Sequence, residues 1–453
     1  MLYCRRIIVT GSPHTKERQD AKMILIKDGY LLDPESGYEG EADILIQGET
    51  IKRIFFGGGV DPSMLMVEEP EILDAQGQCV APGLVDVHVH FREPGFEYKE
   101  DISSGAKAAA KGGYTTVVLM ANTKPLVDNP ETLEYVNAKA KETDIHVRTC
   151  AAVSKGFEGK EFTDYEKLLS LGAVGFTDDG MPLMDENFLY QAMEKIAKLQ
   201  VPISLHEENP RLISENGINA GKAAAYFQIK GSPKEAEISM VKRDVELAKK
   251  TGAVLNVQHI SCKETVEIIR QAKEQGYDNI HAEATPHHFT LNEEAVIEWA
   301  AMAKMNPPLR EEEDRKAIIE GLKDGTIEMI ATDHAPHSKE EKEREITKAP
   351  SGILGLETAL ALGLGELVEK NGMPLLDLIE RMSYFPAKMY GLEAGYVKEG
   401  GPADLVIFDP NELWRVEKFL SKSQNSPFLG KMMLGKVKTT ICKGKIIYQD
   451  KEE

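Results

Sequence analysis

Eight short apolar segments alternate with helical segments through the middle of the chain, and this alternation strongly limits the possible folds. The apolar segments are residues 84–89, 115–120, 146–152, 173–176, 201–205, 253–257, 280–284 and 327–331. Segments between them, such as 263–275, carry apolar residues at helical spacing. Eight strand–helix units over about 250 residues are typical of a closed barrel. Because no G-x-G-x-x-G motif follows the first strand, the pattern favours an α/β protein with a (β/α)8 TIM barrel over an open doubly wound sheet.

The two ends of the chain have a different pattern, in which short apolar runs are separated by turn residues such as K-D-G and C-K-G-K. We expect residues 23–80 and 395–453 to pair into one composite β-sandwich beside a barrel of residues 81–394. Residues 1–22 change from apolar to polar before Met23, which predicts a flexible N-terminal extension.

The composition excludes several classes of partner. The net charge is −20, from 54 basic and 74 acidic residues, which argues against binding to nucleic acid or to a membrane surface. No apolar run reaches the ~18 residues of a membrane-spanning helix. The five cysteines have no C-x-x-C spacing, as in proteins of reducing compartments. We therefore expect a cytoplasmic protein.

Two histidines close the first apolar segment, V-D-V-H-V-H-F. Since side chains alternate along a strand, His88 and His90 should share one face and the neighbouring valines the other. An isolated H-x-H pattern fits a metal site or a half-exposed strand equally well. In a (β/α)8 barrel, however, the chemistry lies at the C-terminal ends of the strands, and those ends carry further polar residues. In chain order they are Arg92, Asn122, Asp178, Asp179, His206, His259, His287, His288, Asp333, His334 and His337.

These residue types indicate metal chemistry. Histidine nitrogens and carboxylate oxygens suit Zn²⁺ and similar divalent ions. The candidates outnumber the ligands of one tetrahedral ion, which favours two ions bridged by a carboxylate and a hydroxide. Such a pair generates a nucleophile near neutral pH, and an aspartate at the end of strand eight could transfer the proton. The pattern predicts metal-assisted hydrolysis of an amide, and Arg92, Asn122 and His337 could hold an anionic substrate.

Seven motifs resemble those of the cyclic amidohydrolases, specifically the dihydroorotases of the longer bacterial type (class I). The resemblance implies reversible, zinc-dependent cyclisation of N-carbamoyl-L-aspartate to (S)-dihydroorotate in pyrimidine synthesis. Ala121, Glu207 and Ser351 depart from the usual family residues, which bears on affinity more than on the reaction. The motifs are P-G-L-V-D-V-H-V-H-F-R-E-P-G (82–95), A-N-T-K-P (121–125), F-T-D-D-G (176–180), L-H-E-E-N (205–209), Q-H-I-S (258–261), M-N-P-P-L-R (305–310) and A-T-D-H-A-P-H (331–337).

The resemblance also implies a role for each residue. One zinc would be held by His88, His90 and Asp333, and a second zinc by His206 and His259. Asp179 and a hydroxide would bridge the two ions, Asp178 being the less favoured of the aspartate pair. Asp333 would also act as general acid and base. The remaining positions would bind substrate: Arg92, Asn122 and His337 its carboxylate, and Asn306, Ser351 and Gly352 its ring.

Two other functions stay open. Hydantoinases, dihydropyrimidinases and allantoinases are sister enzymes, but they usually carry a lysine on strand four and lack the arginine anchor. A non-catalytic homologue that binds aspartate transcarbamoylase would typically have lost metal ligands, and this chain retains them all. The resemblance further implies a homodimer and an association with aspartate transcarbamoylase. The Glu-rich segment 339–345 after strand eight is expected to be a solvated loop, for which a lid role stays open.

Overall fold

The computed structural model describes residues 22–65 and 70–451. The predicted flexible extension, residues 1–22, lies outside these ranges apart from Lys22. Among the helices in the described ranges, none is both long enough and apolar enough to cross a membrane.

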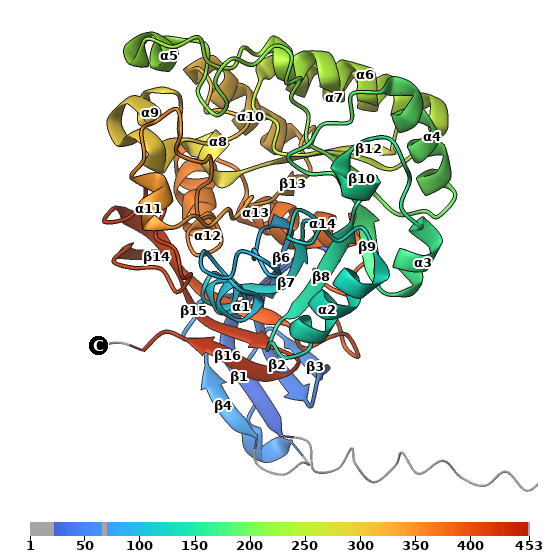
Figure 1. Ribbon diagram of the computed structural model, residues 1–453. Coiled ribbons are helices and arrows are strands. Elements are labelled where there is room, and N and C mark those ends of the chain that lie inside the picture. The colour runs from blue at the N-terminus through green and yellow to red at the C-terminus, as the bar shows by residue number, and fades with distance from the viewer. Residues whose placement is uncertain (1–21, 66–69, 452–453) are drawn as a thin grey trace, which may run out of the picture.

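Eight parallel strands pair in chain order to form the barrel (Figure 1). The ring is completed at the C-terminal ends of the strands, where Val89 forms a parallel bridge with His334. There the His90 N–H also donates to the His334 carbonyl at 3.0 Å. The (β/α)8 prediction is therefore confirmed. The strands are β6 (Leu84–Val89), β7 (Tyr114–Leu119), β8 (His146–Ala151), β9 (Ala173–Phe176), β10 (Ile203–Leu205), β11 (Leu255–Val257), β12 (Ile280–Ala284) and β13 (Met329–Ile330).

Helices cover the strands from outside, and their apolar faces build the main core (Figure 1). Helix α1 begins at a capping box in which Asp101 and Ser104 bond each other's backbone N–H groups. Segment 339–345, expected to be a loop, contains a one-turn helix that Ser338 and Glu341 cap in the same way. The helices are α1 (Ile102–Lys111), α2 (Pro130–Ala140), α3 (Tyr165–Ser170), α4 (Glu186–Ala197), α5 (Lys222–Phe227), α6 (Glu235–Thr251), α7 (Lys263–Glu274), α8 (Pro286–Thr290), α9 (Glu294–Trp299), α10 (Glu312–Asp324), α11 (Lys339–Lys342), α12 (Ala359–Leu362), α13 (Leu375–Ile379) and α14 (Phe385–Met389), with π-helical segments at Gly363–Lys370 and Glu380–Tyr384.

Strand β6 departs from simple alternation. Val85 and Val87 pack in a cluster with Tyr390, which follows α14, whereas Val89 packs in the main core with Phe91. The pairing of β6 with β7 shifts register between Asp86 and Val89, which explains the change of face. The expectation that the valines share one face is therefore wrong for Val89.

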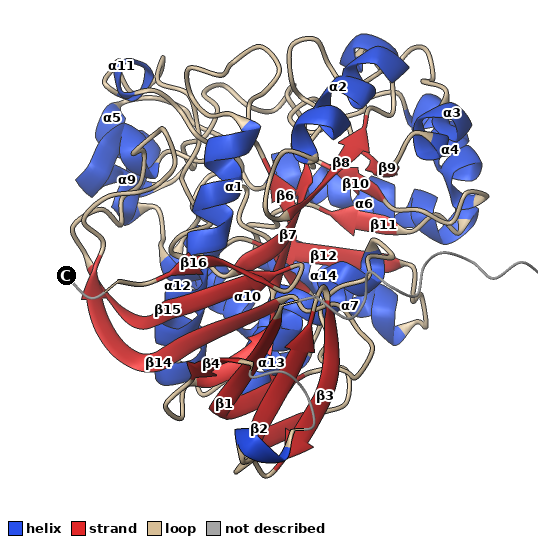
Figure 2. Ribbon diagram, turned by 90° about the horizontal axis from the view of Figure 1, so that it is seen from below, coloured by secondary structure: helices blue, strands red, loops and turns tan. Residues whose placement is uncertain are grey.

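Both ends of the chain contribute to one second sheet, as predicted (Figure 2). Strand β5 from the N-terminal segment pairs with strand β14 from the C-terminal segment, and Val80 lies antiparallel to Ile407 in this pair. His146, at the start of barrel strand β8, bonds Asp404 at 2.9 Å and ties the barrel to this sheet. The sheet order is β16–β15–β14–β5–β1–β2–β3, with β4 also paired to β1. The strands are β1 (Met23–Asp33), β2 (Tyr38–Gln47), β3 (Thr50–Phe56), β4 (Glu71–Asp74), β5 (Cys79–Pro82), β14 (Leu405–Arg415), β15 (Met432–Cys442) and β16 (Lys445–Gln449).

Candidate metal centre and active site

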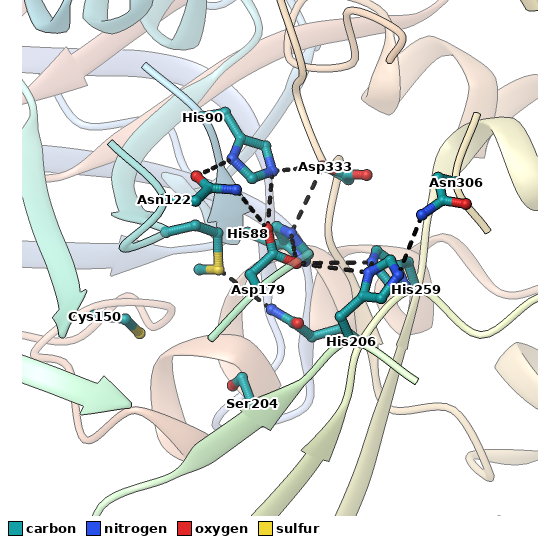
Figure 3. A network of polar contacts seen from close by, with 12 residues as sticks. His88, His90, Asn122, Cys150, Asp179, Ser204, His206, His259, Asn306 and Asp333 are labelled. Carbon is teal, nitrogen blue, oxygen red and sulfur yellow. Dashed lines mark hydrogen bonds and ion pairs between the residues drawn. The ribbon is translucent and has the colours of Figure 1, made fainter. Parts of the chain in front are cut away.

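Six predicted metal ligands meet at the C-terminal rim of the barrel (Figure 3). They lie at or just beyond the ends of five strands, β6, β9, β10, β11 and β13, and β6 supplies two of them, so the closure of the barrel brings them together. All six are buried: His88, His90, Asp179, His206, His259 and Asp333.

The carboxylate of Asp179 lies among four imidazoles (Figure 3). Its Oδ1 is 3.6 Å from His88 Nε2, 3.8 Å from His206 Nδ1 and 4.0 Å from His259 Nε2. Its Oδ2 is 3.5 Å from His90 Nε2. One carboxylate therefore faces ligand nitrogens from both predicted ion sites.

Asp333 completes one of the two groups of ligand atoms. Its Oδ1 lies 2.8 Å from His90 Nε2 and 3.6 Å from His88 Nε2. On the other side of Asp179, His206 Nδ1 lies 3.0 Å from His259 Nε2. The ligand atoms thus lie in overlapping groups around Asp179, because His259 lies close to His88 and Asp333 as well as to His206.

Three of the imidazoles have a second polar partner that fixes which ring nitrogen faces Asp179. His88 Nδ1 bonds Glu283 Oε1 at 2.5 Å, and His90 Nδ1 bonds Asn122 Oδ1 at 3.0 Å. The remaining nitrogen of each ring then has a lone pair for a metal ion. Glu283 was not predicted, although a glutamate between two alanines near the C-terminal end of strand β12 is a signal that could have identified it.

His206 is held in the same way but with its ring reversed. Its Nε2 lies 3.3 Å from Glu208 Oε2, which leaves Nδ1 toward Asp179. Glu208 is itself buried and accepts a hydrogen bond from Ser232 Oγ at 3.2 Å. Glu208 stands in the L-H-E-E-N motif at the end of β10, but the sequence pattern assigned it no role, so its contact with His206 was not predicted.

The spacing of these atoms fits a divalent ion. Two ligand atoms of a tetrahedral zinc site, each about 2.1 Å from the ion, lie about 3.4 Å apart. His88 Nε2 is 3.6 Å from the oxygens of both Asp179 and Asp333, too far for a hydrogen bond. This nitrogen is buried without a hydrogen-bond partner among the described residues. A metal ion would satisfy it.

The electrostatics of the cluster centre on Asp179. Burial opposes ionisation of Asp179, but the facing imidazoles, His88 foremost, lower its pKa far below the ordinary value. Burial lowers the pKa of His259 well below its ordinary value, and the neighbouring rings of His206 and His88 add to this. Burial opposes protonation of His88 and His206, but nearby carboxylates, Glu283 for His88 and Glu208 for His206, raise the pKa of both rings. Because a neutral imidazole is the form that coordinates a metal, metal binding would displace the protons of these two rings.

The backbone is constrained at three of the site residues. Arg92, His259 and Asp333 have positive φ angles of 61°, 32° and 45°. Residues other than glycine rarely adopt this region, and they retain it where surrounding contacts enforce it, commonly at functional sites. The chain thus turns sharply at the ends of β6, β11 and β13 to aim these side chains.

A pocket of about 430 Å³ opens over the metal ligands and is lined by most of the predicted substrate-binding residues. Arg92 Nη2 lies 3.4 Å from His337 Nε2. Burial lowers the pKa of His337 well below its ordinary value, and Arg92 and Lys99 add to the effect, so this ring is neutral. The predicted substrate-binding residues that line the pocket are Arg92, Asn122, Asn306, His337 and Ser351.

The other predicted binding residues are placed as follows. Asn122 is engaged at both ends, since its Nδ2 donates to Asp179 Oδ2 at 3.0 Å while its Oδ1 faces His90. Asn306 Nδ2 lies 3.2 Å from His206 Nε2, and its buried Oδ1 has no partner in the described chain. Gly352 lies against His337, because a Cβ there would come within 2.6 Å of the imidazole Cδ2.

The remaining polar residues at the strand ends have other contacts. Asp178 accepts the N–H of Val153 at 2.7 Å and faces away from the metal ligands. His288 Nε2 bonds the carbonyl of Pro307 at 3.0 Å. His334 Nδ1 accepts the N–H of Gly355 at 3.2 Å. These contacts are structural.

Comparisons with known proteins agree with this geometry. Residues 77–265 match the family described as "Dihydro-orotase-like". The dihydroorotase of Clostridioides difficile (strain 630) is 56% identical, over 94% of this chain and all of that protein. The dihydroorotase of Clostridium acetobutylicum is 52% identical, over 95% of this chain and its full length.

Solved structures give the same fold. L-hydantoinase (dihydropyrimidinase) from Arthrobacter aurescens superposes with a TM-score of 0.84 at 26% identity, covering 95% of this chain and 97% of that one. The barrel with its histidine and aspartate rim thus defines an amidohydrolase. Within that class, the chain belongs to the dihydroorotase family.

We expect Glu283→Gln to weaken metal binding by about 10- to 100-fold, as is usual when the partner of a metal-ligating histidine is lost. Glutamine offers one acceptor oxygen, whereas Glu283 accepts from His88 through Oε1 and from Asn256 through Oε2. Chelator titration followed by metal analysis measures the change. Glu328→Gln is the control, because Glu328 bonds His281 away from the rim; equal metal retention in both variants would contradict the role of Glu283.

Proposed function

We propose that this chain catalyses the reversible cyclisation of N-carbamoyl-L-aspartate to (S)-dihydroorotate in pyrimidine synthesis. The observation that carries the proposal is one pocket that joins the Asp179-centred ligand cluster to Arg92, in a chain 56% identical to a dihydroorotase. A metal cluster suits hydrolysis of a cyclic amide, and an arginine beside it suits a carboxylate-bearing substrate.

The proposed cofactor is a pair of Zn²⁺ ions. His88, His90 and Asp333 would hold one ion, His206 and His259 the other, and Asp179 would bridge them together with a hydroxide. Bound there, two divalent ions supply a hydroxide nucleophile near neutral pH and polarise the amide carbonyl. The distances of Asp179 to all four imidazoles support this arrangement.

Asp333 is the proposed general acid and base. Its carboxylate lines the pocket beside His90, where it can exchange a proton with the reacting group. In hydrolysis it would accept the proton of the nucleophile and pass it to the departing amide nitrogen. In ring closure it would run the same transfer in reverse.

The substrate would be oriented by the pocket residues around Arg92. The planar guanidinium of Arg92 can pair with a carboxylate through two N–H donors, and its Nε is oriented by the carbonyl of Pro336 at 3.2 Å. His337 and Asn122 would complete the carboxylate site. Asn306, Ser351 and the backbone of Gly352 would contact the ring, supported by the partnerless Oδ1 of Asn306.

The alternatives have less support. The hydantoinase and dihydropyrimidinase neighbours share 24–26% identity with this chain, against 56% for a dihydroorotase. Asp179 stands where these sister enzymes usually carry a lysine, and Arg92 serves an acidic substrate. A non-catalytic homologue that binds aspartate transcarbamoylase is disfavoured, because the complete ligand set is present and buried.

The resemblance also predicts a cytoplasmic enzyme that forms a homodimer and associates with aspartate transcarbamoylase. Analytical ultracentrifugation of the chain alone and with that enzyme distinguishes a monomer, a dimer and a mixed complex.

Metal analysis of the purified, active protein should find close to two divalent ions per chain. Removal of metal with a chelator should abolish dihydroorotate hydrolysis, and added Zn²⁺ should restore it. A single ion at full activity would remove the bridging role of Asp179.

Asp333→Asn should lower kcat for dihydroorotate hydrolysis at least about 100-fold, because an amide cannot accept the proton while its oxygen can still face the metal site. Ultraviolet absorbance measures turnover, and metal analysis checks that both ions remain. Activity within about tenfold of the parent, with metal content intact, would exclude Asp333 as general base.

Arg92→Met should raise KM for dihydroorotate at least about tenfold, which corresponds to a loss of about 1.4 kcal/mol in binding. Arg148→Met is the matched control, since Arg148 is an exposed arginine near the start of strand β8. An unchanged KM in Arg92→Met would contradict the carboxylate site.

A further inference from the structure

Lys304 lies between the active-site pocket and residues 346–352, the segment that follows α11. It lines the pocket, and the residue is 4% exposed. Its ammonium group donates to the carbonyl oxygens of Ile346 and Ala349, each at 2.8 Å. Its own carbonyl accepts the N–H of Gly352 at 2.9 Å. Lys304 therefore binds the segment at three points.

Lys342, the last residue of α11, holds the same segment from another side. Its ammonium group donates to the carbonyl oxygens of Pro350 and Gly352, both at 3.0 Å. Asn425 Nδ2 donates to the Gly352 carbonyl at 3.0 Å as well. Four carbonyl groups between residues 346 and 352 thus accept hydrogen bonds from lysine ammonium groups, and not from the backbone N–H groups of a helix or strand.

The segment that these lysines hold forms one wall of the substrate pocket. Thr347, Ala349, Pro350 and Ser351 line it. Gly352 lies directly against the ring of His337, so the position of its backbone limits where that ring can lie. A displaced segment would disturb the proposed carboxylate site and the ring contacts together.

Neither the Lys304 nor the Lys342 ammonium group has a paired carboxylate among the described residues. Burial lowers the pKa of Lys304 to about 8. Burial, with the charge of Lys304, lowers the pKa of Lys342 to about 7. Uncompensated buried charge is costly, and an anion bound nearby reduces that cost. By contrast, Lys339 on the same helix is exposed and lies 3.6 Å from Glu343.

We propose that Lys304 and Lys342 are positioning residues that hold segment 346–352 in the conformation that binds the anionic substrate. The proposal rests on the proposed function for the identity of that substrate. The lysines hydrogen-bond pocket-wall backbone and do not contact the metal ligands. Their loss should therefore weaken binding and leave the chemical step largely intact.

The test compares Lys304→Met and Lys342→Met with Lys339→Met in the full-length, metal-loaded protein. Methionine is similar in length and has no donor. We expect KM for dihydroorotate to rise at least about tenfold in the first two variants, with kcat within about threefold of the parent. The Lys339→Met control and the metal content of all variants should be unchanged. A kcat that falls while KM stays constant would overturn the proposal.

Hydrogen exchange of the backbone amides gives a readout that needs no substrate. Exchange within residues 346–352 should accelerate in Lys304→Met and Lys342→Met and stay as in the parent in Lys339→Met. Unchanged exchange would overturn the proposal even if the parent hydrolyses dihydroorotate. Inactivity of the parent toward dihydroorotate would instead refute the proposed function. If a methionine variant fails to fold, Lys304→Gln and Lys342→Gln replace it, because glutamine keeps an N–H donor but has no charge. These variants should show a smaller rise in KM and a smaller acceleration of exchange.

Discussion

The site depends on one buried carboxylate. Asp179 is enclosed by four histidine rings inside the rim of the barrel, with its oxygens 3.5–4.0 Å from their nitrogens. A buried ionised carboxylate is costly unless positive charge or a metal compensates it. Because the ring nitrogens come from three different strand ends, the compensation exists only when the barrel is closed. Folding and assembly of the site are therefore coupled.

Hydrogen bonds from surrounding residues hold the side chains around Asp179 in place. Glu283, Asn122 and Glu208 each fix one histidine ring. Beyond them, the His90 N–H and the carbonyl of His334 close the strand ring where β6 meets the end of β13. On the open side, the pocket wall has no regular secondary structure, and buried lysines hold it instead. The candidate metal ligands are thus held by strand ends and buried side-chain partners, whereas a few side-chain hydrogen bonds to the backbone hold the pocket wall.

Most of the fold was predictable because apolar runs bounded by helices carry strong periodic signals. Segments 84–89, 173–176 and 280–284 match β6, β9 and β12. Segments 201–205 and 327–331 are longer than β10 and β13, because residues at strand ends can be buried and apolar without pairing. The face of Val89 was mispredicted, since a register shift depends on the neighbouring strand.

The site was predictable where residues follow a strand directly, and less so where contacts come from distant segments. The sequence indicated the aspartate pair 178–179 and the four histidines through their positions at the ends of apolar runs, and the family resemblance favoured Asp179. Glu283 and Glu208 gave weak signals, because their role is to orient the rings of His88 and His206, which are brought to them by the fold. Nothing local marks Lys304 or Lys342, whose partners are backbone carbonyls some 8 to 45 residues away.

We propose that the metal cluster and Arg92 together select a cyclic amide that carries a carboxylate. The most direct measurement compares kcat/KM for dihydroorotate with that for dihydrouracil, hydantoin and allantoin in one ultraviolet assay. Dihydrouracil is the sharpest comparison, because it has the same ring without the carboxylate. Dihydroorotate should be hydrolysed, and kcat/KM for each of the other three compounds should be at least about 100-fold lower. Equal or faster hydrolysis of dihydrouracil or hydantoin would contradict this proposal.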